Sequence, residues 1–359
     1  SPYVRTTKAG GSKLSKTLNY LPEGEYKLSA NIYAYSYNTR NSQQLYLNDQ
    51  TLTINSARNR IATLRSVTGS VASEYTIEFA ISTTSTSTAT NIAMDNVSLV
   101  YQGTVAEYIE GIETITYEMT AEASSLTGKA MNAEAKASLL EVLNGVEATL
   151  ANYTSKIASG TVELSDANAW IAAMEAVESA VANAKLSIEA YVALGSQITA
   201  ARTKAALYPQ ETCGGIDEFG LDAINSKFVN GEYLDSEIPA AVIEVKGITN
   251  RYLMADAVAY GSASNPIDVS AFIVEQAGFD NDVYAPWQAS PTPGVAYGSI
   301  EFYNTNFTLS QVLYGMPAGT YRLQTRAFYR YGDQPTNYTA HNNGTLQRNA
   351  KLYISHSEG

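Results

Sequence analysis

The segment at residues 21–37, LPEGEYKLSANIYAYSY, decides the fold class of this chain because its side chains alternate. Even-numbered positions from 26 to 34 are apolar, and odd-numbered positions from 27 to 31 are polar. A period of two predicts a strand of an antiparallel sheet with one face buried and the other exposed. In this register the exposed face continues with three aromatic rings, those of Tyr33, Tyr35 and Tyr37.

The same segment recurs near the other end of the chain. Residues 315–331 read GMPAGTYRLQTRAFYRY, and Pro317 stands 295 residues after Pro22. A repeat at fixed offset predicts two copies of one supersecondary unit, here a β-domain. Within residues 14–28, seven residues are identical to those at this offset, namely Leu14, Ser15, Leu18, Pro22, Gly24, Tyr26 and Leu28.

The two copies lack different parts. The second opens with residues 262–297, which have no counterpart in the first, and the first continues to Tyr101 through strands that the second does not repeat. We therefore expect each β-sandwich to be incomplete within this sequence. One interpretation is that the sequence is a window from a longer protein. The other is that neighbouring copies complete each other, because an unpaired strand edge invites a further strand.

The residues between the two copies are rich in Ala, Glu and Leu, with apolar residues at steps of three and four. This single stripe is typical of antiparallel helices packed lengthwise. Only Gly195 interrupts the pattern between Ser165 and Tyr208, which predicts one long helix shared by two bundles. We expect a multi-domain α+β chain, with β-sandwiches at 1–103 and 261–359 flanking a rod of three-helix bundles at 104–186 and 187–260.

Composition excludes several functional classes. The 359 residues carry a net charge of −12, which disfavours nucleic-acid partners. Cys213 is the only cysteine, so no intrachain disulfide forms, and no apolar run is long enough to span a membrane. Two isolated histidines make no metal cluster, and the common nucleophile, phosphate and zinc motifs are absent. These observations predict a protein that is not an enzyme, although a carboxylate pair for glycoside hydrolysis stays open.

Three segments carry a family resemblance. Residues 268–287, with Phe279, Asp280 and Trp287, resemble the first strands of galactose-binding-like β-sandwich modules. Residues 313–330 resemble the central strand of such modules, and residues 92–101 resemble the last one. These modules are jelly rolls found in many carbohydrate-binding proteins, so the resemblance implies a jelly-roll fold for both sandwiches.

The helical middle resembles FIVAR-type three-helix spacer modules, and the combination is similar to large exported proteins of gut Bacteroidota. This resemblance implies an extracellular or cell-surface location. It also implies a structural calcium ion, because Asp95 and Asp280 stand where such modules often hold one, although in different copies. The alternative is that Asp280 and Asp282 are ordinary turn residues.

The exposed tyrosines are the candidate ligand-binding residues. Sugar rings stack on aromatic faces, and the phenol adds a hydrogen-bonding group. We expect Tyr33, Tyr35 and Tyr37 to bind a glycan together with Asn38 and Arg40. In the second copy the corresponding face would present Arg326, Phe328 and Arg330, whose guanidinium groups suit acidic sugars or acidic side chains. The alternative is that another strand, a loop or the helices cover this face.

The sequence thus predicts a non-catalytic exported surface protein whose sandwiches bind a glycan or surface polysaccharide. Neighbouring copies of the chain are a second expected partner. A purely structural stalk, fibre or adhesin segment without a sugar site is the alternative. An accessory region of a larger glycoside hydrolase is a further one.

Overall fold

The computed structural model describes residues 4–6, 13–35, 42–55, 61–83, 91–327, 332–346 and 350–356. The chain divides into two compact units. The first comprises Ser1–Ser196 with Ala223–Ala241, and the second comprises Gln197–Asp222 with Val242–Gly359. Helices and antiparallel sheets are both present, so the α+β class is confirmed. The division into four domains proposed from the sequence stays a prediction.

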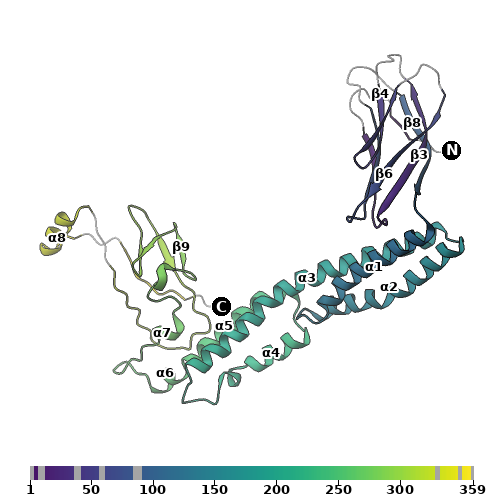
Figure 1. The fold of residues 1–359 in the computed structure, drawn as a ribbon. Helices are drawn as coiled ribbons and strands as arrows, with labels where there is room; N and C mark the ends of the chain where they lie inside the picture. Colours follow the sequence, from purple (N-terminus) through teal and green to yellow (C-terminus); the bar gives the residue numbers. More distant parts are fainter. Residues whose placement is uncertain are drawn as a thin grey trace. The chain divides into compact units, whose positions relative to one another are not determined.

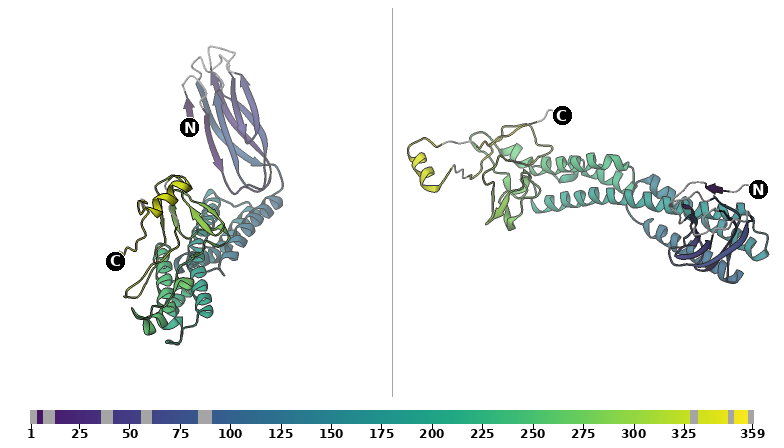
Figure 2. Two further views of the ribbon diagram at one scale, coloured as in Figure 1. Left: turned by 90° about the vertical axis from the view of Figure 1, so that its left-hand side faces the viewer. Right: turned by 90° about the horizontal axis from the view of Figure 1, so that it is seen from above.

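The N-terminal part of the first unit consists of two four-stranded antiparallel sheets (Figures 1 and 2). One sheet has the order β1-β8-β3-β6, and the other has the order β2-β7-β4-β5. The strands are β1 (Val4–Thr6), β2 (Lys13–Leu18), β3 (Gly24–Tyr35), β4 (Ser42–Leu47), β5 (Gln50–Asn55), β6 (Thr63–Val71), β7 (Ile77–Thr83) and β8 (Asn91–Tyr101).

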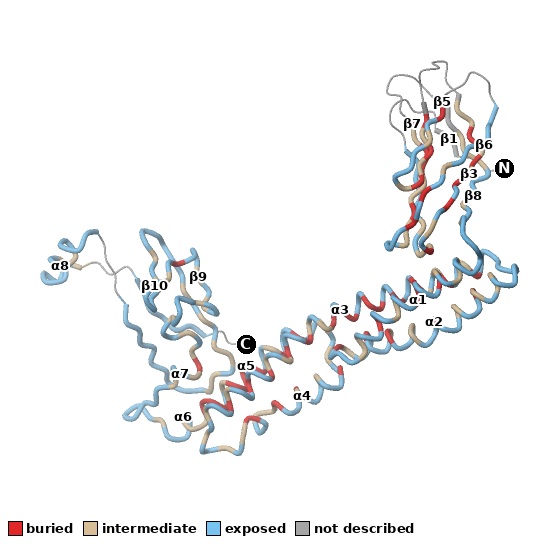
Figure 3. Tube along the Cα trace, viewed as in Figure 1, coloured by how far each residue is buried: buried red, intermediate tan, exposed pale blue. Residues whose placement is uncertain are grey.

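The two sheets enclose one core, which makes this part a β-sandwich (Figure 3). Strand β3 supplies Tyr26, Leu28, Ala30 and Ile32, whose side chains are at most 2% exposed. These are even-numbered positions, so the predicted register of this strand is confirmed. The facing sheet contributes buried residues from β4, β5 and β7.

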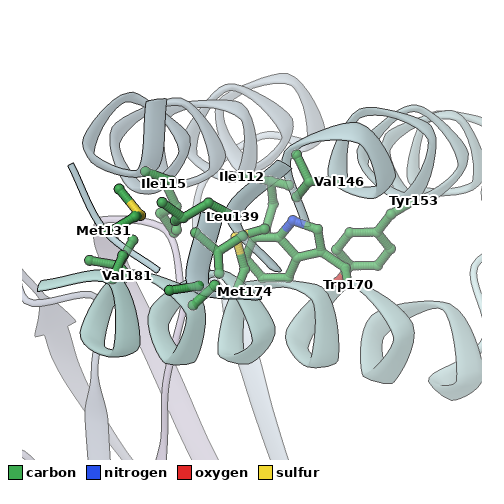
Figure 4. Close-up of a cluster of buried hydrophobic side chains, with 14 residues drawn as sticks. Ile112, Ile115, Met131, Leu139, Val146, Tyr153, Trp170, Met174 and Val181 are labelled. Carbon is green, nitrogen blue, oxygen red and sulfur yellow. The ribbon is translucent and has the colours of Figure 1, made fainter. Parts of the chain in front are cut away.

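Three helices follow the sandwich: α1 (Val105–Leu126), α2 (Ala133–Ser159) and α3 (Leu164–Leu207). They share a core in which the Trp170 indole stacks on Tyr153 with ring centroids 5.6 Å apart (Figure 4). Thr104 and Glu107 form a capping box that starts α1, and Gly160 ends α2 in the left-handed conformation. Helix α3 runs through Gly195 without a break for 44 residues, which confirms the predicted long helix.

Five further helical segments follow α3 within the described residues 208–260. They are η1 (Ile216–Phe219), α4 (Leu221–Asn230), η2 (Asp235–Glu237), α5 (Ile238–Leu253) and α6 (Ala255–Tyr260). In the second unit, the Tyr252 hydroxyl of α5 donates to the Ala205 carbonyl of α3 at 3.3 Å. The Phe219 ring meets Tyr252 edge-on with centroids 5.9 Å apart, so α5 and η1 pack beside the end of α3.

The C-terminal part of the second unit holds two two-stranded antiparallel sheets, β10-β11 and β12-β9. Its elements are α7 (Ser270–Ile273), η3 (Asp280–Asp282), β9 (Gln288–Ser290), β10 (Gly294–Ala296), β11 (Ser299–Glu301), β12 (Thr308–Ser310) and α8 (Gln334–Asn342).

The prediction of a central strand at residues 313–330 is wrong for its described part, because residues 311–327 belong to no strand. The physical reason is the lack of ladder partners. In the first copy, β3 is paired on both sides, with β6 and with β8. Among the described residues of the second unit, no strand pairs with this stretch, so no ladder holds its backbone extended.

Candidate functional site

The candidate site is the outer face of sheet β1-β8-β3-β6, meaning the face that points away from the sandwich core. Since side chains alternate along a strand and the even positions of β3 are buried, its odd positions lie on this face. Ladder partners share a face, and Asn31 stands opposite Asp95 while Tyr33 stands opposite Ala93. An aromatic ring, an amide and a carboxylate therefore neighbour one another here.

A β-bulge brings Asp95 to this position. The register of β3 against β8 shifts between Ser29 and Asn31, and Asn96 adopts a positive φ of 51°. The Asp95 carboxylate oxygen Oδ1 accepts a hydrogen bond from the Asn96 amide nitrogen at 2.7 Å. Bulges commonly re-aim a side chain, and with this one Asp95 stands two ladder pairs from Tyr33, which is the next position on the same face.

The outer face also carries exposed apolar side chains. Leu64 of β6 stands opposite Asn31 and is 69% exposed. Val100 of β8 stands opposite Lys27 and is 50% exposed. Apolar surface between hydrogen-bonding groups suits a ligand that has both flat C–H faces and hydroxyl groups.

The structure describes only part of the predicted aromatic strip. Tyr33 is half-buried, and Tyr35 pairs with Asn91 through the backbone. The side chain of Tyr35 lies outside the described residues, as do Tyr37, Asn38 and Arg40. The strip of three rings stays a prediction.

In the second copy, Phe328 and Arg330 also lie outside the described residues. Arg326 is described and exposed, but it belongs to no strand. Its predicted place on the outward face of a strand is therefore wrong, because no described strand of the second unit pairs with this stretch.

The two candidate calcium ligands fall in different compact units, Asp95 in the first and Asp280 in the second. Asp280 begins the short helix η3, and the neighbouring Asp282 accepts a hydrogen bond from the Gly298 amide at 3.2 Å. Within the described ranges, no group of three or more His, Cys, Asp or Glu side chains is placed to hold a metal. The calcium site stays a prediction.

A second feature, which the sequence did not reveal, is the joint between the sandwich and the helices. The Tyr20 hydroxyl donates to the Glu178 carboxylate of α3 at 2.6 Å, and the Tyr75 hydroxyl donates to Glu118 of α1 at 2.9 Å. Desolvation and the bond to Glu118 raise the pKa of Tyr75 to about 12. The only signal in the sequence is an aromatic residue just ahead of the turn at Pro22, and it does not name a partner.

Two further contacts connect the sandwich to helix α1. The rings of Tyr101 and Tyr108 meet edge-on with centroids 5.3 Å apart. Gly111 of α1 lies so close to Pro22 that a Cβ atom at Gly111 would stand 2.4 Å from the proline Cβ. Sandwich and helices of the first unit are thus packed against each other and not merely tethered.

A cavity of about 420 Å³ lies beside this joint. An ion pair between the Lys185 Nζ and the Glu122 Oε1, 2.5 Å apart, forms part of its wall. The lining residues come from the Tyr20 turn, α1 and α3: Tyr20, Met119, Glu122, Val177, Glu178, Val181, Ala182 and Lys185.

In the part of the chain that the structure describes, no helix combines the length and the apolar character needed to cross a bilayer.

Comparison with known proteins shows no family for this chain. No protein-family model matches the chain, and no curated protein matches it. Among solved structures, the chain is similar to the carbohydrate-binding module TmCBM61, solved in complex with beta-1,4-galactotriose. The match has 11% sequence identity and a TM-score of 0.23, and it covers 28% of this chain and 69% of that one. A likeness this weak is a similarity only.

Proposed function

We propose that the N-terminal sandwich is a carbohydrate-binding module and that its outer face is the binding surface. One observation carries the proposal: Tyr33 and the Asn31–Asp95 pair are neighbours on that face, two residues apart along β3. The aromatic ring provides a surface for the C–H face of a sugar. The amide and the carboxylate provide the hydrogen bonds that fix sugar hydroxyls.

The arrangement suits a neutral or weakly polar sugar chain more than an acidic one. Asp95 contributes negative charge next to Tyr33, and the whole chain carries a net charge of −12. An acidic glycan would be repelled by both. The ligand class we propose is therefore a neutral oligosaccharide that runs across β8 and β3, with Tyr35, Tyr37, Asn38 and Arg40 extending the surface.

The architecture fits this role. The strand orders β1-β8-β3-β6 and β2-β7-β4-β5 are those of an eight-stranded jelly roll, which supports that assignment for residues 4–101. The helices α1, α2 and α3 share one core, which supports a three-helix spacer. We propose a non-catalytic, exported protein of the cell surface in which such spacers hold binding modules apart. We also propose structural calcium in each complete module, with Asp95 as a ligand in the first copy and Asp280 as a ligand in the second.

A glycan array tests the proposal on the whole chain. Wild type should bind one class of neutral glycan, and Tyr33→Ala should lose that binding. Tyr117→Ala is the matched control, because Tyr117 is 74% exposed and belongs to helix α1, not to the sheet that forms the outer face. Retained binding by Tyr33→Ala overturns the assigned surface. An array run with calcium and with a chelator tests the ion separately.

A purely structural role is the second candidate, and the joint favours it. Tyr20 and Tyr75 pack against the helical core and bond to glutamates, so tyrosines of this sandwich serve as structural contacts. If the array is negative for every glycan and joint variants reduce stability, the stalk interpretation replaces the binding module.

A further inference from the structure

The two copies match in structure at the same offset as in sequence. Strand β11 starts at Ser299, 295 residues after the start of β1 at Val4, and β12 starts at Thr308, 295 residues after the start of β2 at Lys13. The same side-chain hydrogen bond follows in both copies: the Tyr26 hydroxyl donates to the Pro22 carbonyl at 2.9 Å, and the Tyr321 hydroxyl to the Pro317 carbonyl at 2.6 Å.

The equivalent strands have different partners. In the first copy, β1 pairs with β8 and β2 pairs with β7, and each of the two stands at the edge of its sheet. In the second copy, the equivalents β11 and β12 pair with β10 and β9, which precede them in the chain. The first copy thus shows this strand pair bonded to strands that follow it, β7 and β8. The second copy shows the equivalent pair bonded to strands that precede it, β9 and β10.

The edge at β2 has the exposure expected of an uncovered strand. All of its residues except Leu18 are exposed, including Leu14, which is 44% exposed although it stands opposite the buried Ile81. Its equivalent in the second copy, Leu309, stands opposite Ala289 of β9 and is half-buried. A strand of the β9 type would cover Leu14 in the same way.

We propose that the edges of β1 and β2 are an acceptor for a strand pair of the β9–β10 type. The completed module then has ten strands, in the orders β10-β1-β8-β3-β6 and β9-β2-β7-β4-β5. The occupant is a polypeptide segment with the pattern of residues 262–297, joined to β1 as residues 297–298 join β10 to β11. Main-chain hydrogen bonds supply the affinity, as in other cases of strand addition.

The register follows from the second copy. Ile300, the equivalent of Arg5, stands opposite Val295, and Leu309 stands opposite Ala289. The added pair should therefore place its Val295 equivalent against Arg5 and its Ala289 equivalent against Leu14. The surface so formed is a pair of strand edges, distinct from the outer face assigned to sugar.

The second copy lacks the strand pairing that buries the equivalent residues in the first copy. Tyr321 and Leu323 are 39% and 43% exposed, whereas their equivalents Tyr26 and Leu28 are 2% and 0% exposed. In the first copy these side chains lie in β3, which pairs with β6 and β8. The two copies therefore behave as overlapping parts of one module.

The test is a chain in which residues 262–298 are copied ahead of Val4 in place of residues 1–3. Backbone amides of β1 and β2 should then exchange with solvent at least about tenfold more slowly, because ladder bonds protect them. Amides of β3 should be unchanged, which shows that the sandwich remains folded. The control carries Ala289→Pro and Val295→Pro in the added copy only, since proline disrupts a ladder.

Unchanged exchange in β1 and β2 overturns the proposal, and so does equal protection from the proline control. Sedimentation of the extended chain identifies the source of any protection. A monomer supports the assigned occupant, whereas protection that appears only in dimers assigns the added strands to a second copy and overturns the assignment.

Discussion

The Tyr20 hydroxyl lies 2.6 Å from the Glu178 carboxylate and joins the turn before β3 to the middle of α3. The two residues are 158 positions apart in the chain. The same tyrosine meets Trp170 edge-on, with ring centroids 6.3 Å apart, so one side chain contacts both the core of the helices and their surface. The sandwich is thereby held against the helices of the first unit.

Replacing Tyr20 with Phe removes the hydrogen bond and keeps the ring. We expect a loss of about 1 kcal/mol in the free energy of unfolding, the usual net contribution of one such bond. Urea unfolding followed by tryptophan fluorescence measures it, since Trp170 lies beside this ring. Tyr117→Phe, at an exposed position of α1, should leave the free energy of unfolding unchanged. An equal loss in both variants would show that the bond to Glu178 contributes no stability.

Gly111 is required because Pro22 lies close to its Cα atom, and not because of its backbone angle. A Cβ atom there would meet the Pro22 ring at 2.4 Å, so Gly111→Ala should cost about 1–3 kcal/mol through overpacking of the joint. Gly145→Ala in α2 is the matched control. Nothing lies within 4 Å of its added Cβ, and the change should stabilise by about 0.5–1 kcal/mol. Thermal melting should show a lower melting temperature for Gly111→Ala and a higher one for Gly145→Ala. A shift in the same direction for both variants would contradict the close contact at Gly111.

The buried indole of Trp170 depends on one acceptor. Its Nε1 donates to the Thr116 Oγ1 at 3.1 Å within the core of the helices. Thr116→Val keeps the volume but leaves the N–H unsatisfied, which should destabilise by about 1–3 kcal/mol. Thr149→Val is the control, because Thr149 is only half-buried and its hydroxyl donates to the Gly145 carbonyl of its own helix. Chemical denaturation should separate the two, and equal stabilities would mean that water replaces the lost acceptor.

Alkaline pH should weaken the joint. The pKa of Tyr75 is raised to about 12, and burial also raises the pKa values of Tyr20 and Tyr108. The unfolded value is about 10, so the folded state holds these protons more tightly. The resulting stabilisation is complete below about pH 10 and is lost as the pH rises towards about 12.

Unfolding free energies measured across this range should therefore fall as the pH rises. The double variant Tyr20→Phe/Tyr75→Phe carries two fewer of these protons and should show a shallower fall. A variant curve parallel to that of wild type would mean that the two phenols do not contribute.

The sequence predicted local periodicities better than contacts between distant residues. Alternation over positions 26–34 correctly identified the buried face of β3, and the apolar stripe correctly identified the length of α3. The strand expected at 313–330 was wrong because a strand needs partners as well as a suitable pattern. Tyr26 and Tyr321 lie in similar local sequences, yet among the described strands only that of Tyr26 is paired within a sheet.

At the candidate site, too, the sequence predicted the local pattern but not the contacts between distant residues. Alternation alone places Tyr33 on the outer face. That Asp95 is its neighbour depends on the pairing of β3 with β8 and on the bulge at Asn96, which no local pattern reveals. The joint was missed because the bond between Tyr20 and Glu178 is set by how the sandwich packs on α3, and a pattern read along the chain does not report such packing.

The measurement that tests the central claim most directly is a calorimetric titration of the best neutral glycan from the array into wild type, Tyr33→Ala and Tyr117→Ala. Our account predicts that Tyr33→Ala weakens binding by about tenfold or more, equivalent to about 1.4 kcal/mol, while Tyr117→Ala binds as wild type does. All three proteins should melt within a few degrees of one another, since Tyr33 lies outside the core. Equal affinities for wild type and Tyr33→Ala would contradict a sugar-binding role for the outer face.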